Sequence, residues 1–192
     1  TASNLVQGIY TVTVTDAQQC SATATVTITQ PNEVVAAITG NLVICEGAST
    51  TLTASGGTTY SWDNGETVSS ITVSPTTTTT YTVTATKDGC TDQAQATVTV
   101  NALPEATASG DVVCAGETIN LTAGGGTSYS WTGPNSFSSS LQNPTIASST
   151  SAAAGVYTVT VTNDATGCSS TATATVTVNA LPEATASGDV VC

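Results

Sequence analysis

The chain has 192 residues, of which thirteen are acidic and one, Lys87, is basic, so its formal net charge is −12. A single basic residue excludes the clustered Lys and Arg that binding to nucleic-acid phosphates requires, and it disfavours docking on anionic membranes. Hydrophobic residues make up 39% and charged residues only 7%, and much of the apolar content is Val and Ala alternating with Thr. This alternation indicates β-structure with one buried and one solvated face.

The first pattern in chain order is "GIYTVTVTDAQQCSATATVTITQP" (Gly8–Pro31), in which two alternating stretches flank a polar turn with a Cys. The pattern returns as "TYTVTATKDGCTDQAQATVTVN", which ends at Asn101, and as "VYTVTVTNDATGCSSTATATVTVN", which ends at Asn179. Each copy is predicted to be an antiparallel hairpin. The turn of the second copy contains Asp88-Gly89, and the turn of the third contains Thr166-Gly167. The return strands are expected to bury Ala22, Ala24, Val26 and Ile28, then Ala94, Ala96, Val98 and Val100, and finally Ala172, Ala174, Val176 and Val178.

A second repeated block precedes the later two hairpins. "VICEGASTTLTASGGTTYSW" (Val43–Trp62) matches "VVCAGETINLTAGGGTSYSW" (Val112–Trp131) position for position. "NALPEATASGDVVC" also occurs twice, at Asn101–Cys114 and Asn179–Cys192. The repeats predict four segments: the back end of a truncated repeat at 1–31, complete domains at 32–101 and 102–179, and the first strand of a further truncated repeat at 180–192. On this interpretation the chain is a window on a longer tandem array.

Six cysteines without a CxxC pair and without His are typical of disulfides rather than zinc ligands, and they indicate a location outside the cytoplasm. One bridge in each complete domain predicts the pairs Cys45–Cys90 and Cys114–Cys168. Cys20 and Cys192 are then expected to have their partners in the missing halves of the truncated repeats.

The aromatic residues fit a buried core. Tyr60 alternates with Trp62, and Tyr129 with Trp131, as core-facing positions of a strand do. The predicted core residues are Trp62, Trp131, Tyr81 and Tyr157. The alternative interpretation, that the Trp rings stack on sugars, needs exposed rings, and Phe137 alone lies outside the core pattern.

The run from Ala153 to Val159, "AAGVYTV", resembles the D-x-G-x-Y-x-C passage between strands E and F of immunoglobulin-like domains. The resemblance implies that Tyr157 forms a tyrosine corner and that Trp131 is the central tryptophan of strand C. Val159 and Ala123 occupy the positions of the two family cysteines, so the usual bridge between the sheets is absent. A bridge between Cys114 and Cys168 is instead expected to clamp one end of the sandwich. The implied fold class is all-β, with tandem immunoglobulin-like β-sandwich domains in a linear array.

The opening stretch "SNLVQGIYTVTVTDAQQCSATATVTITQP" resembles the closing half of SprB-type repeats, which occur in giant gliding-motility adhesins. The complete domains resemble immunoglobulin-like repeats of large proteins exported by the type nine secretion system. These resemblances imply a role in cell adhesion at the extracellular cell surface, with neighbouring repeats of the same long chain as partners.

An enzyme is not expected, because there is no His and no evident base to activate the many Ser and Thr hydroxyls. The acids fall singly in turns, so no catalytic residue, metal ligand or cofactor is predicted. Calcium at a domain junction, held by Glu105 and Asp111, stays an open alternative. No apolar run approaches the roughly 20 residues that cross a bilayer, so no direct membrane insertion is expected.

We therefore expect a structural segment, the shaft or stalk of a very large extracellular surface adhesin or filamentous appendage. Alternating Thr on exposed edges suggests lateral association into a homo-oligomeric, multi-chain filament as a further hypothesis. The alternative is a non-catalytic binding or spacer module of a secreted enzyme that acts on polysaccharide.

Overall fold

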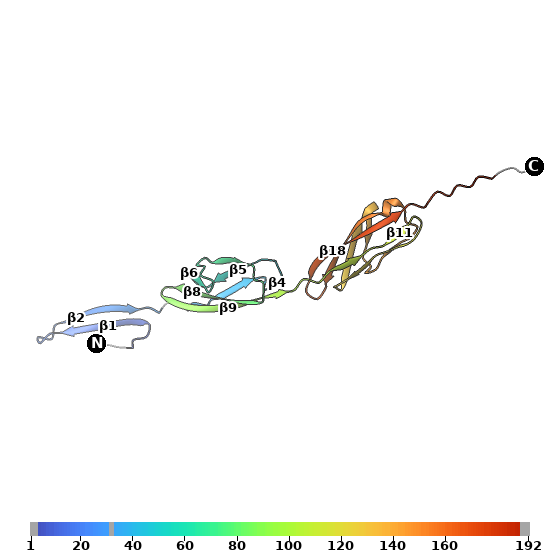
Figure 1. Ribbon diagram of the computed structural model, residues 1–192. Coiled ribbons are helices and arrows are strands. Elements are labelled where there is room, and N and C mark those ends of the chain that lie inside the picture. The colour runs from blue at the N-terminus through green and yellow to red at the C-terminus, as the bar shows by residue number, and fades with distance from the viewer. Residues whose placement is uncertain (1–3, 31–32, 189–192) are drawn as a thin grey trace, which may run out of the picture. The chain divides into compact units, whose positions relative to one another are not determined.

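The computed structural model describes residues 4–30 and 33–188 (Figure 1). Strands dominate these residues, and the helical segments among them are two short 3-10 turns, η1 (Pro134–Ser136) and η2 (Ser151–Ala153). The chain forms two compact units. The first comprises the chain up to Leu42 together with Ser49–Ser74 and Thr79–Val98, and the second comprises Val43–Ala48, Pro75–Thr78 and the chain from Thr99 onward.

The N-terminal hairpin consists of β1 (Gly8–Thr15) and β2 (Ser21–Ile28), paired antiparallel from Gly8↔Ile28 to Thr15↔Ser21. The carboxylate of Asp16 organises its turn, because one oxygen accepts hydrogen bonds from the N–H groups of Gln18 (2.9 Å) and Cys20 (2.8 Å).

The expectation that the return strand of this hairpin is buried is wrong. Ala22, Ala24 and Val26 are exposed, Val26 by 55%, and Ile28 is only half-buried. Val26 and Ala24 lie opposite Tyr10 and Val12 in the register, so the apolar side chains do share one face. Alternation correctly placed these residues on one face, but burial also needs a second layer against that face, and the described residues leave it open to solvent.

The next sandwich contains seven strands in two sheets. One sheet has the order β3-β5-β7, and the other has the order β4-β9-β8-β6. Strands β3, β5 and β7 correspond to A, B and E of an immunoglobulin-like domain, and β6, β8 and β9 correspond to C, F and G, with β4 added beside β9. The strands are β3 (Ala37–Gly40), β4 (Val43–Cys45), β5 (Thr50–Ser55), β6 (Thr59–Trp62), β7 (Ser70–Val73), β8 (Thr79–Lys87) and β9 (Cys90–Asn101).

Two strand pairings in this sandwich determine where its cysteines lie. β8 and β9 form the predicted hairpin, closed by Asp88 (φ 49°) and Gly89 (φ 79°), whose positive φ angles are those of a type I′ turn. The short strand β4 runs parallel to the end of β9, so that Val43 lies opposite Thr99 and Cys45 opposite Asn101.

The second sandwich repeats this topology with an extra edge strand. Its largest sheet has the order β11-β18-β17-β14-β15, and the opposite layer is made of the pairs β10-β13 and β12-β16. Its strands are β10 (Thr107–Ser109), β11 (Val112–Cys114), β12 (Ile119–Asn120), β13 (Thr122–Gly124), β14 (Ser128–Gly133), β15 (Phe137–Ser139), β16 (Thr145–Ile146), β17 (Gly155–Asn163) and β18 (Cys168–Asn179). The short strand β11 again runs parallel to the end of β18, with Cys114 opposite Asn179.

Alternating apolar residues fill both cores. The buried hydrophobic residues of the first sandwich include Leu52, Trp62, Ile71, Val83, Ala85, Ala96 and Val98, and those of the second include Ile119, Leu121, Trp131, Tyr157, Val159, Val161, Ala174 and Val176. The intervening Thr residues of β9 and β18 are exposed. The fold is therefore all-β, with tandem immunoglobulin-like sandwiches.

Tyr157 forms the tyrosine corner that the sequence predicts. Its buried hydroxyl donates a hydrogen bond to the carbonyl oxygen of Ala153 at 2.8 Å. Its ring packs edge-on against Phe137, with 5.3 Å between the ring centroids and an interplanar angle of 74°. Burial raises the pKa of this phenol above its ordinary value of 10.0.

Hydrogen exchange should separate the hairpin β1–β2 from the sandwiches. A two-stranded hairpin with an uncovered apolar face is marginally stable, so its amides should exchange at close to unprotected rates. Amides of β8, β9, β17 and β18 should exchange orders of magnitude more slowly, because they lie in covered sheets. Exchange followed by mass spectrometry checks this, and equal protection of β1–β2 and β17–β18 would contradict it.

Replacing Tyr157 by Phe should change stability in two ways. The lost hydrogen bond to Ala153 should lower the free energy of unfolding at pH 7 by about 1–2 kcal/mol. In the parent chain, the raised pKa means that the contribution of this phenol to stability is fully present below about pH 10, the pKa of the unfolded phenol. That contribution is lost as the pH rises through the folded pKa. The variant should lose less stability over that range.

Denaturant unfolding from pH 7 to 11, with thiols alkylated beforehand, measures both effects. Some alkaline loss should persist in the variant, because burial and, secondarily, the charge of Asp63 raise the pKa of Tyr81 as well. An unchanged alkaline slope in the Tyr157→Phe variant would show that its phenol is not the group that titrates.

Candidate functional site

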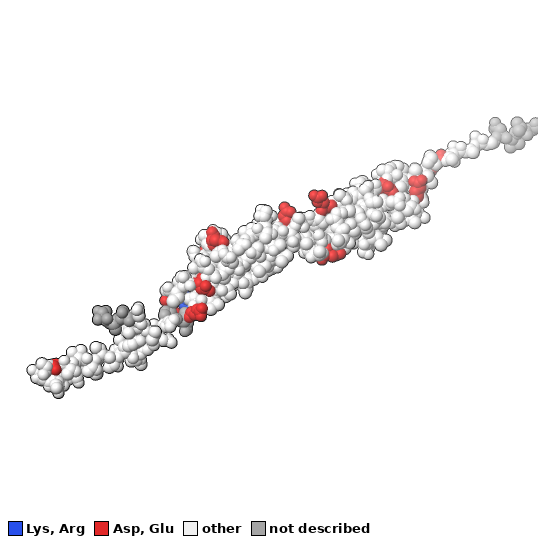
Figure 2. Space-filling view, turned by 90° about the horizontal axis from the view of Figure 1, so that it is seen from below, with Lys and Arg blue, Asp and Glu red and all other residues white. Residues whose placement is uncertain are grey.

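Several acidic side chains hold local structure through hydrogen bonds to backbone N–H groups. In the first sandwich, Asp63 accepts a hydrogen bond from the N–H of Thr82, and Asp92 accepts one from the N–H of Ala36, both at 2.8 Å. Figure 2 shows most carboxylates of the visible face as separate spots, with the basic residue beside some of them near one end of a sandwich. Among the residues that the structure describes, no three His, Cys, Asp or Glu side chains are grouped as a metal site.

Of the two residues considered for calcium, Asp111 has hydrogen-bond partners within its own sandwich. Asp111 accepts hydrogen bonds from the backbone N–H (2.8 Å) and the side-chain amide (2.9 Å) of Asn120. These bonds tie the segment before β11 to strand β12. In the described part of the chain, no helix has the length and apolar character needed to span a membrane.

The tryptophans are core residues. Trp62 is 3% exposed and Trp131 is fully buried, so neither ring is available to stack on a sugar. Their indole N–H groups donate to the carbonyl oxygens of Val68 (2.9 Å) and Gln142 (3.3 Å). Of the other two residues predicted for the core, Tyr157 is buried and Tyr81 is half-buried.

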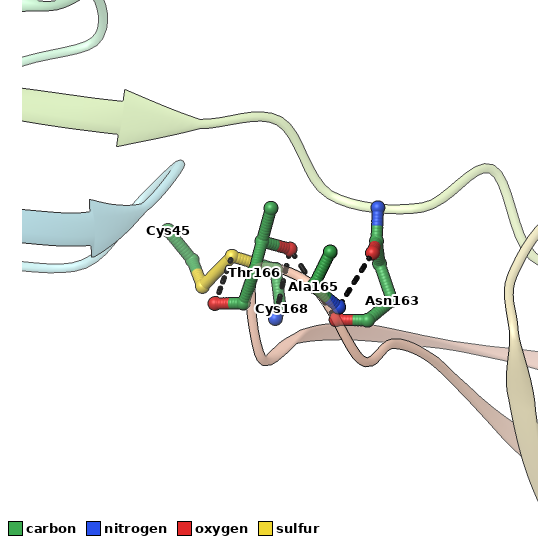
Figure 3. Close-up of a disulfide and its surroundings, with 5 residues drawn as sticks. All are labelled: Cys45, Asn163, Ala165, Thr166 and Cys168. Carbon is green, nitrogen blue, oxygen red and sulfur yellow. Dashed lines mark hydrogen bonds between the residues drawn. A yellow bond between two sulfur atoms is a disulfide. The ribbon is translucent and has the colours of Figure 1, made fainter.

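The strongest candidate for a functional feature is a disulfide between Cys45 and Cys168. The two residues are 123 positions apart in the sequence, and their Cα atoms lie 5.6 Å from each other. Figure 3 shows Cys45 at the end of β4 and Cys168 beside the turn that precedes β18. Both residues belong to the second compact unit. Cys45 lies in the domain that the sequence predicts at 32–101, and Cys168 lies in the one predicted at 102–179.

This bond overturns the predicted pairs Cys45–Cys90 and Cys114–Cys168. Cys45 lies opposite Asn101, the last residue of β9, whereas Cys90 is the first residue of the same 12-residue strand. At about 3.3 Å per residue, the two ends of β9 are roughly 35 Å apart. A disulfide needs Cα atoms within about 7 Å.

The same geometry separates the second predicted pair, because Cys114 lies opposite Asn179 at the far end of β18 from Cys168. The expected clamp at one end of a single sandwich is therefore wrong, since each sandwich carries its two cysteines at opposite ends.

A turn of four residues, from Asp164 to Gly167, presents Cys168. The side-chain oxygen of Asn163 accepts a hydrogen bond from the N–H of Ala165 (3.1 Å). The backbone carbonyl oxygen of Asn163 accepts one from the N–H of Gly167 (2.7 Å). The hydroxyl of Thr166 accepts a hydrogen bond from the N–H of Cys168 (3.3 Å). The sequence placed Thr166 in this turn but gave no role to Asn163, although Asn near a Gly is typical of side-chain-stabilised turns.

Cys45 is held by a turn of its own. The N–H of Glu46 donates to Asn101 at 2.9 Å, and the N–H of Ala48 donates to the carbonyl oxygen of Cys45 at 3.0 Å. Gly47 between them has φ 80°, a left-handed conformation that favours glycine. Both sulfurs are therefore positioned by hydrogen-bonded backbone rather than by free loops.

Three other cysteines in the described residues are not bonded. Cys20 and Cys114 are exposed, and Cys90 is half-buried. Cys192, which was expected with Cys20 to have a partner in a truncated repeat, lies outside the described residues.

The sheet order, the parallel short strand and the tyrosine corner are the features by which the second sandwich can be compared with known domains. Residues 105–178 match the family model of the PKD domain. We refer to these residues as the PKD-like repeat. A search of curated protein sequences returned no relative.

Several solved structures are similar to the chain. Three N-terminal domains of the highly immunogenic outer capsid protein (Hoc) of bacteriophage RB49 are 20% identical, with a TM-score of 0.43; the match covers 74% of this chain and 58% of that fragment. DIP-gamma IG1+IG2 is 12% identical with a TM-score of 0.35, covering 75% and 97% of the two chains. The amphioxus IgVJ-C2 molecule is 16% identical with a TM-score of 0.36, covering 71% and 99%. The chain thus spans less than two thirds of the Hoc fragment.

PKD and immunoglobulin-like domains are generally non-catalytic structural or adhesion modules. The PKD-like repeat and the disulfide together indicate an extracellular or secreted, non-catalytic binding or structural module. Its distinctive chemical feature is the covalent bond between Cys45 and Cys168.

Replacing Cys168 by Ser should destabilise the PKD-like repeat. A bridge that closes a loop of this length removes about 5 kcal/mol of unfolded-state entropy on the chain-entropy model, and measured effects are typically 2–4 kcal/mol. Cys90→Ser is the matched control, because Cys90 opens the equivalent strand without a partner, and it should change stability far less. Calorimetry of the oxidised proteins measures both. Equal losses in the two variants would contradict a bond at Cys168.

Proposed function

We propose that the chain is a segment of the shaft of a very large extracellular surface adhesin or filamentous appendage. The single observation that carries the proposal is the Cys45–Cys168 bond, which links successive non-catalytic repeats covalently. The resemblance of the opening stretch to SprB-type repeats supports export by the type nine secretion system and a part in gliding motility or cell adhesion. The alternative role as a sugar-binding module draws no support from Trp62 and Trp131, whose rings are buried.

The disulfide changes how the chain carries tension. A force along the backbone reaches Cys45 and passes through the sulfur–sulfur bond directly to Cys168. The 122 residues between them, one fewer than their separation of 123, are bypassed and cannot be extended while the bond is intact. At up to about 3.6 Å per residue, this locks roughly 440 Å of contour length. Such protection is useful to a load-bearing shaft and of little use to an untethered secreted enzyme.

The solvated faces of the sheets suit close contact between chains. Facing hydroxyls bond across the strands, as in Thr80 with Thr97 (2.8 Å) and Thr53 with Ser70 (2.8 Å). These ladders give an uncharged polar surface on which a second copy could pack without burying unpaired charge. Lateral association of copies into a filament, in addition to neighbouring repeats as partners, is part of the proposal.

Immunogold electron microscopy of intact source cells tests the proposed location. Antibody raised against the 192-residue chain should label filaments that project from the cell surface, with gold particles spaced along them. Label confined to a soluble secreted product or to digested polysaccharide would overturn the shaft and favour the accessory module.

Force spectroscopy tests the mechanical role. The oxidised chain, pulled from its two termini, should release roughly 440 Å less contour length than the Cys45→Ser/Cys168→Ser double variant. A Cys90→Ser/Cys114→Ser variant, which keeps the bond, should behave as the parent. Equal contour lengths for the parent and the first variant would show that the bond does not carry the load.

A further inference from the structure

Each sandwich carries two cysteines in fixed places. The strand-end cysteines, Cys45 and Cys114, are the last residues of the short strands β4 and β11. The turn cysteines, Cys90 and Cys168, are the first residues of the long strands β9 and β18. The structure bonds one strand-end cysteine, Cys45, to one turn cysteine, Cys168, and leaves Cys114 and Cys90 unbonded.

The two strand-end cysteines have the same backbone surroundings. Cys45 lies opposite Asn101, and Cys114 lies opposite Asn179, in parallel pairs of identical register. The residue after each cysteine donates to that Asn, at 2.9 Å from Glu46 and 2.8 Å from Ala115.

The turn that follows each strand-end cysteine is also shared. The N–H three residues after the cysteine donates back to the cysteine carbonyl, at 3.0 Å for Cys45 and 3.1 Å for Cys114. A glycine with positive φ completes both turns, Gly47 at 80° and Gly116 at 95°. Cys114 is thus presented as Cys45 is, and it is exposed where Cys45 is bonded.

The turn cysteines are equivalent as well. Cys90 pairs with Lys87, the last residue of β8, and Cys168 pairs with Asn163, the last residue of β17. Cys20 occupies the corresponding place in the first hairpin, where its carbonyl oxygen accepts a hydrogen bond from the N–H of Asp16 at 2.9 Å.

We propose that the Cys45–Cys168 bond is one rung of a regular ladder, in which the strand-end cysteine of every repeat is bonded to the turn cysteine of the repeat that follows. Cys114 then forms a disulfide with the turn cysteine of a following repeat of the same kind, and Cys90 forms one with the strand-end cysteine of a preceding repeat. The inference concerns the covalent pattern of the repeats and does not rest on the proposed role as a shaft.

The bond forms by oxidation of two thiols. One sulfur–sulfur bond replaces two S–H bonds, and the two electrons and two protons pass to a disulfide-containing oxidant, which is reduced to two thiols. Oxidised glutathione serves as this oxidant in the test below. Because every repeat except the outermost would be bonded to two neighbours, reduction of one rung would leave the adjacent rungs intact.

The duplicated fourteen residues make a direct test possible. Asn179–Cys192 has the same sequence as Asn101–Cys114, so a second copy of residues 115–179 placed directly after position 192 continues the repeat without an artificial linker. The extended chain carries Cys192→Ser, which leaves Cys114 as the strand-end cysteine nearest the added repeat. The comparison protein is the 192-residue chain with the same substitution.

Both proteins are refolded in a glutathione redox buffer, and their free thiols are counted. The comparison protein should have three, on Cys20, Cys90 and Cys114, and the extended protein should have two, because Cys114 is consumed. An extended protein whose added turn cysteine is replaced by Ser is the matched control and should return to three.

Digestion after Asp and Glu identifies the partner, because these residues place each cysteine in a separate peptide, whereas Lys87 gives trypsin a single site. The peptide 112–117 should be joined to peptide 165–179 of the added copy. The original turn gives the longer peptide 165–183, which should be joined to peptide 34–46. That second link shows in the same molecule that the existing repeats have folded.

Two results would overturn the ladder. In one, the link between Cys45 and Cys168 forms but Cys114 stays a free thiol in the extended protein. In the other, Cys114 is found bonded to Cys168, Cys90 or Cys20 instead of to the added copy. Neither result depends on where the protein lies on a cell, so they are distinct from a failure of the proposed shaft.

Discussion

The parallel pairing of one short strand with the last strand of each sandwich is the constraint on which the covalent architecture depends. Because β4 runs in the same direction as β9, it ends where β9 ends, and the hairpin turn lies where β9 begins. A cysteine after the short strand and a cysteine after the turn are therefore separated by the whole length of a strand. The two thiols of one sandwich cannot meet, and a bond can form only with another repeat.

Features fixed by local sequence could be predicted. Alternating Thr with Val or Ala specified β8, β9, β17 and β18, and Asp88-Gly89 specified a tight hairpin turn, because strand faces and turn geometry depend on adjacent residues. The tyrosine corner of Tyr157 followed from a short motif and involves a carbonyl only four residues upstream.

The disulfide could not be predicted in the same way, because it depends on which strands are neighbours and in which direction they run. Counting one bridge per domain gave the wrong partners for Cys45 and Cys168. The sequence pattern does not show that β4 runs parallel to the end of β9, which places Cys45 beside Asn101 and a whole strand away from Cys90. The prediction that the first hairpin is buried failed for a related reason, because alternation identifies an apolar face but not the layer that covers it.

The core of the PKD-like repeat does without the bridge that usually joins the two sheets. Ala123 and Val159 occupy those positions and are buried, with Trp131 and Tyr157 among the residues that fill the space between the layers. Close packing stabilises the interior, so the cysteines are free to act at the ends of the repeats. Stability within a repeat and connection between repeats are thereby assigned to different residues.

The position of the disulfide also sets an order of events during synthesis and export. A chain that emerges from its N-terminus exposes the thiol of Cys45 long before Cys168, which follows 123 residues later, is available. The next thiol to appear after Cys45 is Cys90, and folding of the first sandwich carries it to the far end of β9, out of reach of Cys45. Folding of a sandwich therefore keeps its own two cysteines from pairing with each other. The bond of Cys45 has to wait until the segment that carries Cys168 has been made.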